Sequence, residues 1–557
     1  MNLSPPSSYR PDIDGLRGVA VLMVVLFHAG FGFKGGYVGV DVFFVISGYL
    51  ITGHLLKELQ RGKVDLASFW ERRLRRIAPA LTAMLVATLA IGSWLLFPVD
   101  FAALGESVVA QALLSANLYF WKDSGYFAAA AEEKPLLHLW SLAVEEQFYV
   151  LLPAVLILAH KWLSRKHAPG VVQTRLVQGM AVLLGISLIT SCITVIRAPN
   201  ATFYWLPTRA WELLVGSVLS GLPVAWRLRQ RWQQEAAGAV SLALILVAAL
   251  AYESDTLFPG AAALLPCLGA AGLIWAHSHS PQDSLPSVRP RTWAVMTWRP
   301  LVGVGLISYS LYLWHWPLLA FAHYANVTGE DRVPAKFRAI LVALAFVLAW
   351  ASWRWVETPF RQKTLLKTRR SVFTLGITTA LVSITLGWHM TTHEGWSWRM
   401  QEKVVRYANG AQDKMPAEFW TDLEEAQKGK FPAFGSEDTR PSVMVWGDSH
   451  ARSLLPVFDS LGHQHHASGE AAIYSATAPM TGFFRRSKHG LNERTELLAQ
   501  AVIRRVKEQQ IPHTVLAAYW KECPGKEAAR FSDALVETVR SLKATGTQVW
   551  IVLDVPT

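Results

Sequence analysis

Eleven apolar runs of about 20 residues fill most of the first 390 positions of this chain, and each is long enough to cross the hydrocarbon core of a bilayer as a helix. They cover 16–33, 37–57, 78–97, 142–162, 177–196, 205–222, 236–251, 259–276, 302–322, 336–356 and 371–390. Hydrophobic residues make up 52% of the 557 residues, and charged residues only 17%. This composition is too apolar for one soluble domain. The pattern predicts a polytopic all-α membrane domain with about eleven spans.

Basic residues alternate between rich and poor loops along these runs. The rich segments are 58–77, 161–175, 227–231, 289–299 and 361–370. Loops rich in Lys and Arg stay on the cytoplasmic side of a membrane. We therefore expect an odd number of spans, a cytoplasmic N-terminus, and everything after residue 390 on the outer side. The formal net charge of +12 is then mostly a matter of topology and does not indicate nucleic-acid binding.

The texture changes after residue 390. Residues 391–440 are polar and mixed, which indicates a linker with room for a short helix. From 441 to 557, strand-like runs alternate with helix-like segments, a pattern typical of a parallel-sheet α/β domain. The expected strands and helices are 442–446, 451–461, 471–475, 493–509, 514–519, 529–544 and 549–553. The three scattered cysteines suggest neither a disulfide framework nor a metal site.

His28 interrupts the first apolar run, and a membrane-spanning helix rarely carries an ionisable ring without a functional reason. If the span starts near Gly15, His28 lies roughly 20 Å along the helix axis, toward its outer end. The glycine-rich turn 30–36 leads to Asp41, which is as far from the centre of the turn as His28 is. We expect the two side chains at one depth, where the carboxylate would support the imidazole as a general base. Two alternatives stay open: a histidine bonded to a backbone carbonyl, and an aspartate hydrated at the helix end.

Arg17 precedes His28 by about three helical turns, so both lie on one helical face, with Asp14 nearby. Farther along, Arg72, Arg73, Arg75 and Arg76 occupy four of five consecutive positions. A positive-inside anchor explains one or two of these arginines. Arginine also binds phosphorylated groups through bidentate hydrogen bonds, and the cluster alone does not decide between the two functions.

Three further polar positions interrupt the apolar segments. Glu145 lies near the start of the fourth span, His315 in the outer half of the ninth, and Glu357 at the end of the tenth. The neighbouring Trp and Tyr residues also fit interfacial anchors, and Pro317 fits a simple kink. At these depths, however, ionisable groups need partners.

Several of these segments, in this order, resemble the membrane acyltransferase family 3, the O-antigen and peptidoglycan O-acetylase type. The matching segments are 9–20, 28, 39–52, 69–79, 140–149, 309–317 and 357–359. The resemblance covers about residues 8–365 and leaves 371–390 as an additional transmembrane helix. It implies a multi-pass protein of the bacterial inner membrane that transfers an acyl group, usually acetyl from cytoplasmic acetyl-CoA. The acceptor would be a hydroxyl of a surface glycan or lipid-linked saccharide: O-antigen, lipopolysaccharide, exopolysaccharide or peptidoglycan.

The resemblance also implies roles for single residues. His28 matches the essential histidine of the family, Arg73 and Arg76 match its arginine motif at the donor side, and Glu145 matches its motif glutamate. With the residue patterns above, we expect catalysis by His28, Asp41 and Glu145. We expect donor binding by Arg17, Arg72, Arg73 and Arg76. Asp14, His315 and Glu357 are further polar membrane positions, and we expect acyl-CoA as a substrate with no bound cofactor or metal.

Ser449 directly follows an expected strand and precedes an expected helix, where the helix N-terminus could stabilise an oxyanion. Segment 443–451 resembles the SGNH hydrolase-like domain fused to many members of this family, with Ser449 as nucleophile. That arrangement needs a later Asp-x-x-His, but none follows Ser449, and His450 is badly placed to serve it. The sequence stops after a strand, so we expect a truncated domain rather than one without hydrolase chemistry. In the simpler alternative, Ser449 and Asp448 only cap the helix.

The sequence as a whole favours an inner-membrane O-acyltransferase with a periplasmic α/β domain that receives, positions or processes the acylated glycan. A transporter or flippase with a glycan-binding domain is the main alternative. It would favour inverted repeats and broken helices, and the sequence shows no repeat. A degenerate membrane scaffold beside a glycan-binding domain is a second alternative.

Overall fold

The computed structural model places the chain in two compact units, Met1–Ala408 and Asn409–Thr557. The structure describes residues 9–62, 64–124, 131–223, 226, 228, 230–253, 255–278, 289–326, 333–409, 419–436, 439–484, 486–487, 490–521 and 528–553. Cys523 and parts of the basic segments, among them Lys63, Arg227 and Arg229, lie outside these residues.

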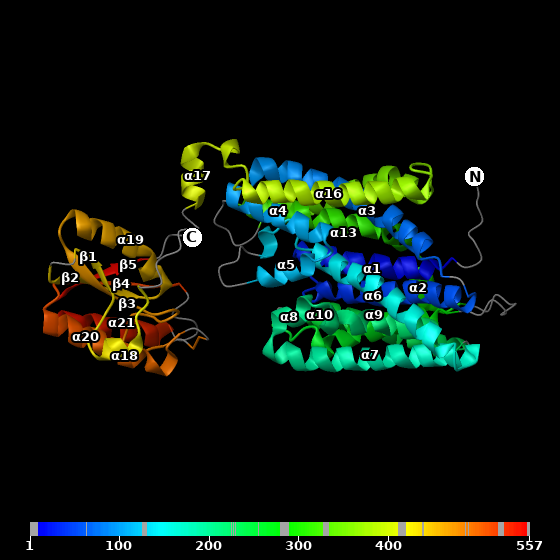
Figure 1. Cartoon of the computed structure of the whole chain (residues 1–557). Helices are drawn as coiled ribbons and strands as arrows, with labels where there is room; N and C mark the ends of the chain where they lie inside the picture. The colour runs from blue at the N-terminus through cyan, green and yellow to red at the C-terminus, as the bar shows by residue number, and fades with distance from the viewer. Residues whose placement is uncertain are drawn as a thin grey trace. The chain divides into compact units, whose positions relative to one another are not determined.

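The first unit is all-helical (Figure 1), and each of the eleven predicted runs coincides with a helix. In order, these are α1 (Pro11–His28), α2 (Gly39–Gln60), α3 (Leu66–Leu95), α6 (Leu139–Leu163), α7 (Pro169–Arg197), α9 (Leu206–Gly221), α10 (Arg231–Ala251), α11 (Leu264–Ala276), α13 (Arg299–Tyr324), α14 (Ala335–Ala351) and α16 (Arg369–Thr392). Among the described residues, seven helices are long and apolar enough to cross a membrane by length and composition. The structure therefore supports a helical membrane domain, with seven clear candidate spans against the eleven predicted.

Shorter helices connect the long ones. They are η1 (Gly36–Val38), α4 (Pro98–Ala112), α5 (Ala116–Lys122), η2 (Ala131–Glu133), α8 (Pro199–Tyr204), η4 (Gly260–Ala263), α12 (Arg291–Met296), the π-helical segment η5 (Ser352–Glu357), α15 (Thr358–Arg361), η6 (Ser397–Arg399) and α17 (Glu402–Asn409). The sequence patterns did not predict α4, which packs against α16. Gly105 of α4 and Gly387 of α16 bring the two backbones into close approach.

The basic segment 58–77 is not the loop that we expected. Helix α2 continues to Gln60, and α3 already begins at Leu66 because Asp65 caps it, accepting a hydrogen bond from the Ser68 amide at 2.9 Å. Hydrogen bonds from the Ser68 hydroxyl and amide, and then the charge of Arg369, lower the pKa of Asp65 to about 2. The arginine cluster therefore lies on the first turns of α3, where successive side chains project from different faces of the helix.

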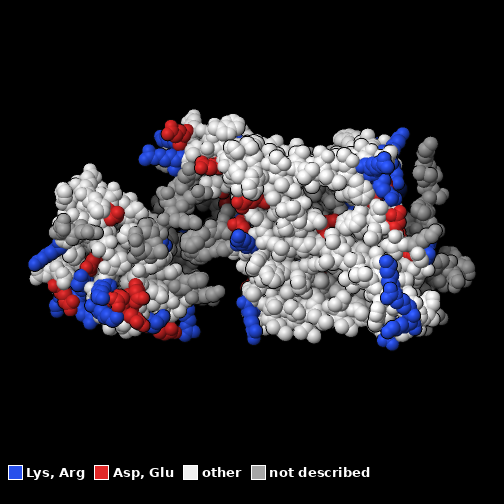
Figure 2. Space-filling view, viewed as in Figure 1, with Lys and Arg blue, Asp and Glu red and all other residues white. Residues whose placement is uncertain are grey.

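Three of the predicted basic segments meet at one end of the helical unit. The Gln60 side chain donates to Gln173 at 2.7 Å, and Arg369 lies 3.3 Å from Asp65. Figure 2 shows Lys and Arg gathered at this end, beside a long uncharged surface. Large apolar side chains are exposed on the helices of this unit, such as Ile196 on α7 and Val347 on α14. Lipid contact explains why they need no protein partner.

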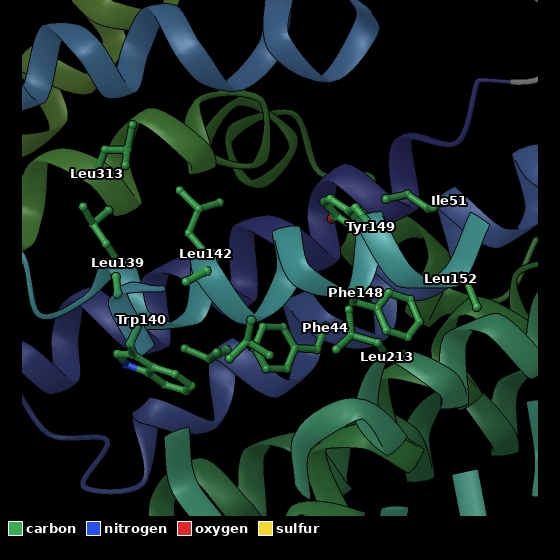
Figure 3. Packing of buried hydrophobic residues seen from close by; sticks show 14 of the residues in the cluster. Phe44, Ile51, Leu139, Trp140, Leu142, Phe148, Tyr149, Leu152, Leu213 and Leu313 are labelled. Carbon is green, nitrogen blue, oxygen red and sulfur yellow. The ribbon is translucent and has the colours of Figure 1, made fainter. Parts of the chain in front are cut away.

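Apolar packing holds the central helices together. Figure 3 shows Phe44 of α2, Leu142 and Phe148 of α6, and Leu213 of α9 converging in one buried cluster. Helices α1 and α13 approach still more closely, because Gly305 of α13 has no side chain. A Cβ atom there would lie 1.7 Å from the Asp14 carbonyl oxygen.

The second unit is an α/β domain with a five-stranded sheet in the order β1-β3-β2-β4-β5. Strand β1 is antiparallel to β3, and the other neighbours are parallel. The elements are α18 (Leu423–Gln427), β1 (Ala433–Gly435), β2 (Pro441–Gly447), α19 (Ser449–Gln464), β3 (Ser468–Ile473), η9 (Asn492–Arg494), α20 (Thr495–Gln509), β4 (His513–Ala517), α21 (Ala528–Lys543) and β5 (Gln548–Val552). Helix α19 covers one face of the sheet, while α18, α20 and α21 lie on the other (Figure 1).

The parallel strands and the three long helices lie where the alternating pattern predicts them. The sheet nevertheless includes residues from the segment expected to be a linker. Strand β1 lies inside 391–440, and the Thr421 amide donates to the Ile473 carbonyl at 3.0 Å. The three residues Ala433–Gly435 can form a short edge strand because their backbone supplies the pairing.

Candidate active site

A cavity lies between α1, α2, α3, α6 and α13 of the helical unit. Its polar lining comes from Arg17, Ser47, Arg73, Arg76, Ser141, Glu145, Ser308, Tyr309 and Tyr312. Apolar side chains complete the wall, among them Phe43 and Phe44. Segments that are distant in the sequence therefore build one pocket with a polar interior.

The charges in this cavity favour an anionic ligand. Three guanidinium groups line it beside one carboxylate, that of Glu145. Glu145 accepts hydrogen bonds from the hydroxyls of Ser47 and Tyr149. The guanidinium of Arg73 lies over the Tyr149 ring, 4.6 Å from its centroid, so the ring fixes its position. Groups with several phosphate oxygens are the natural partners of such an arginine set.

His28 lies at the end of α1 and pairs with a second histidine. Its Nδ1 lies 3.0 Å from Nε2 of His315 on α13. The two rings stack with an interplanar angle of 16°, and Trp316 contacts His28 edge-on with a centroid distance of 4.5 Å. His315 is 1% exposed, while His28 is partly exposed. The partly exposed ring of His28 can therefore contact a ligand, while the buried ring of His315 holds the His28 ring in place.

Tyr312 connects the cavity with the histidine pair. Tyr312 lines the cavity, and its hydroxyl lies 2.6 Å from the Ser141 hydroxyl and donates to the His138 carbonyl at 2.8 Å. Its own carbonyl oxygen lies 2.8 Å from Nδ1 of His315. The buried ring of His138 is 6.0 Å from the His315 ring. One turn of α13 therefore borders both the arginine-lined cavity and the histidines.

His138 and Tyr312 are not among the site residues that we expected from the sequence. Their helical faces would have indicated both. Tyr312 precedes His315 by three residues, and His138 precedes Glu145 by seven, so each pair shares a helical face. The neighbouring aromatic residues favoured an interfacial anchor instead.

Asp41 does not face His28, so the pairing that we expected is wrong. Its carboxylate lies 3.4 Å from the guanidinium of Arg209 on α9, and Glu212 lies 3.1 Å from the same guanidinium. All three side chains are at most 1% exposed. Equal distance from a turn fixes depth but not direction around the helix axis, and Asp41 points toward α9.

The arginine cluster divides into three environments. Arg73 and Arg76 line the cavity. Arg75 is buried, donates to Glu71 at 3.0 Å and to the Phe360 carbonyl at 3.2 Å, and so ties α3 to α15. Arg72, which we had grouped with the donor-binding residues, contacts His54 and Glu58 at the surface instead.

Two further predicted residues have local partners. Asp14 pairs with Arg17 at 3.1 Å, as their spacing indicated. Glu357 is buried in η5 and lies 2.9 Å from Arg361 and 3.4 Å from the Ser310 hydroxyl. Among the described residues, no group of three or more His, Cys, Asp or Glu side chains is arranged to hold a metal ion.

In the second unit, Ser449 is the first residue of α19 and follows the carboxyl end of β2. The buried Asp448 carboxylate accepts hydrogen bonds from the His450 amide at 2.8 Å and the Tyr519 amide at 3.0 Å. The His450 ring stacks on Tyr519 with a centroid distance of 4.8 Å. Asp448 therefore fixes the strand-to-helix turn that presents Ser449.

Comparison with known sequence families places both units. A family model described as an acyltransferase domain matches residues 10–354. The chain belongs to this acyltransferase family. A second model, the SGNH domain fused to AT3 domains, matches residues 418–557. Both resemblances seen in the sequence are thereby confirmed.

Curated relatives agree with this family. The chain is 34% identical over 372 residues to the peptidoglycan O-acetyltransferase OatA of Listeria monocytogenes, covering 64% of this chain and 56% of the relative. It is 32% identical over 370 residues to the O-acetyltransferase OatA of Staphylococcus aureus strain NCTC 8325, covering 64% and 58%. The chain thus spans somewhat more than half the length of these relatives. No solved structure matches it.

The acyltransferase domain contains every residue that lines the cavity, together with His28, His138 and His315. Glu357 lies just beyond the matched segment, and Ser449 lies in the SGNH domain.

Proposed function

We propose that this protein transfers an acyl group, most simply acetyl, from an acyl-CoA to a hydroxyl of a cell-surface or periplasmic glycan. The observation that carries the proposal is the arginine-lined cavity beside the His28–His315 pair. The Listeria relative is named for acetylating peptidoglycan, so peptidoglycan is the first acceptor to test.

The two halves of the site suit the two halves of this reaction. Arg73 and Arg76 would bind the phosphates of the donor. His28 would take the proton from the glycan hydroxyl as its oxygen attacks the thioester carbonyl. The new C–O ester bond forms, the C–S bond breaks, and the thiolate leaves and takes up the proton that His28 accepted, which regenerates the base.

The orientation of the protein belongs to the same proposal. Donor and acceptor would reach the site from opposite sides of the inner membrane. The end rich in Lys and Arg would face the cytoplasm, following the positive-inside rule, and the SGNH domain would lie in the periplasm.

Mass spectrometry of cell-wall glycans tests the proposed function. Cells lacking the gene are complemented with the wild-type chain or with His28→Ala. We expect acetyl esters on the glycan to return with the wild-type chain only. Equal acetylation in both strains, with both proteins present in the membrane, would overturn the proposal.

We further propose that the SGNH domain receives, positions or processes the acylated glycan. Ser449 would be the nucleophile of this domain. Its position at the carboxyl end of β2 and the start of α19 supports this role. In a version of the chain that also supplies the Asp-x-x-His base, Ser449→Ala should lower glycan acetylation, whereas the exposed Ser453→Ala, one turn later, should not. If Ser449→Ala behaves like Ser453→Ala, the hydroxyl serves only as part of the helix start.

A further inference from the structure

We propose that His315 is a positioning residue that holds His28 in one tautomer, with Nε2 of His28 as the nitrogen that accepts the proton of the substrate. This inference deepens the proposed acyl transfer and rests on it. It follows from the hydrogen bonds around the two rings, taken from the buried end outward.

The buried end fixes the first proton. Nδ1 of His315 lies 2.8 Å from the Tyr312 carbonyl oxygen and 3.2 Å from that of Leu311. Carbonyl oxygens can only accept hydrogen bonds. Nδ1 of His315 must therefore carry a hydrogen.

The second proton follows from the first. A neutral imidazole carries one N–H, so Nε2 of His315 has a free lone pair. This nitrogen lies 3.0 Å from Nδ1 of His28, and two lone pairs at that distance would repel each other. Nδ1 of His28 therefore carries its hydrogen, and Nε2 of His28 is left as the acceptor.

The opposite tautomer pair is disfavoured by the same contacts. In that pair, the Nδ1 lone pair of His315 would face the lone pairs of two carbonyl oxygens. No water could relieve this contact, because the His315 side chain is only 1% exposed. Buried polar atoms without a hydrogen bond are disfavoured. The backbone of α13 thus determines which nitrogen of His28 is basic.

The same arrangement stabilises the product of proton transfer. When Nε2 of His28 takes the hydroxyl proton, both nitrogens of that ring carry hydrogen. The Nδ1–H of the imidazolium still donates to Nε2 of His315, which becomes a charge-assisted hydrogen bond. Because Trp316 and Phe27 pack against the His28 ring, with centroids at 4.5 Å and 5.0 Å, the ring keeps its direction.

Two amide variants separate positioning from packing. In His315→Gln, the longer side chain can place an amide oxygen where Nε2 lies and keep an acceptor for His28. In His315→Asn, the shorter side chain can replace only Nδ1, so the contact with Tyr312 can survive while the contact with His28 is lost. We expect His315→Gln to keep transfer within about tenfold of wild type, and His315→Asn to lose at least about a hundredfold, as expected for a general base that loses its orientation.

The readout that a merely structural role would not move is the ¹⁵N NMR spectrum of His28, assigned by its loss in His28→Ala. The probe is the full chain with ¹⁵N-labelled histidine in lipid nanodiscs. Wild type and His315→Gln should show a protonated Nδ1 and an unprotonated Nε2 on His28, whereas His315→Asn should show a mixture of tautomers.

The two proposals fail in different ways. A wild-type spectrum with the proton on Nε2 of His28, or full activity of His315→Asn while His28→Ala is inactive, would overturn the role of His315 alone. Full activity of His28→Ala would overturn the proposed function itself.

Discussion

One guanidinium balances two buried carboxylates beside the site. Arg209 pairs with Asp41 and Glu212, and aromatic rings surround it at 5.4 to 5.5 Å. These rings belong to Phe44, Trp140, Phe203 and Phe258. This group joins α2 to α9, so Asp41 contributes to the packing of the helices that carry the cavity.

Replacing Arg209 with Met should destabilise the protein strongly. Removing one partner of a buried ion pair costs about 3–5 kcal/mol, and here it leaves two carboxylates without a counter-charge. Glu212→Gln, which leaves one carboxylate for one guanidinium, should cost less. Melting in detergent, followed by size-exclusion chromatography, measures both. A stability of Arg209→Met equal to that of wild type would show that the carboxylates are neutral without their partner.

Arg76 lines the cavity and Arg72 does not, so Arg72 serves as the matched control in a test of donor binding by Arg76. A hydrogen bond to a charged group contributes about 1.5–3 kcal/mol, so Arg76→Ala should raise the KM for acyl-CoA roughly ten- to a hundredfold. Arg72→Ala should leave it nearly unchanged. Steady-state transfer rates at varied donor concentration measure the difference. Equal effects in the two variants would make the cluster a topology anchor.

Single side chains show how far the sequence reaches. We predicted His28 as a site residue because it interrupts an apolar helix. We predicted Arg17 because it shares a helical face with His28. The sequence did not identify the partner of His28. His315 lies 287 residues away in the chain, and only the packing of α1 against α13 brings the two together. A prediction from the nearby turn selected Asp41, while the structure brings His315 to His28.

At the scale of elements, the approach of α1 to α13 sets the geometry of the histidine pair. Gly305→Ala would place a methyl group 1.7 Å from the Asp14 carbonyl oxygen, whereas Gly303 has open space around it. Overpacking of this kind costs about 1–3 kcal/mol. Gly305→Ala should lower both the melting temperature and the transfer rate, and Gly303→Ala should change neither. Activity that survives in Gly305→Ala would show that the pair tolerates a wider helix spacing.

Helices and strands were the most predictable level of this structure. Apolar runs locate all eleven of these helices, and among the described residues seven of them are long and apolar enough to cross a membrane. Helix α4 was missed because its polar positions, including Asp100 and Glu106, interrupt the apolar pattern. Strand β1 was missed because three residues are too few to show an alternating pattern. Its backbone pairing with β3 stabilises it instead.

At the scale of the whole molecule, the basic end of the helical unit and the segment after α16 should lie on opposite sides of the membrane. Arg165→Cys and Glu394→Cys, both at exposed positions, test this in a background without the three native cysteines. A membrane-impermeant maleimide added to intact spheroplasts should label Glu394→Cys only. Labelling of Arg165→Cys as well, or instead, would contradict the proposed orientation.

The cavity itself could not be predicted from the sequence. Its arginines, Glu145 and Tyr312 come from four helices, and only their packing decides which side chains face inward. The family resemblance named Arg73, Arg76 and Glu145, which line the cavity, whereas Arg72, which we added from the residue pattern, does not line it.

The most direct test is transfer of radiolabelled acetyl from acetyl-CoA to a soluble glycan acceptor by the purified full chain in proteoliposomes. The wild-type chain should produce labelled ester, and His28→Ala should produce none above background while melting at the wild-type temperature. If His28→Ala transfers acetyl as fast as wild type, the histidine pair is not the catalytic centre and the mechanism is wrong.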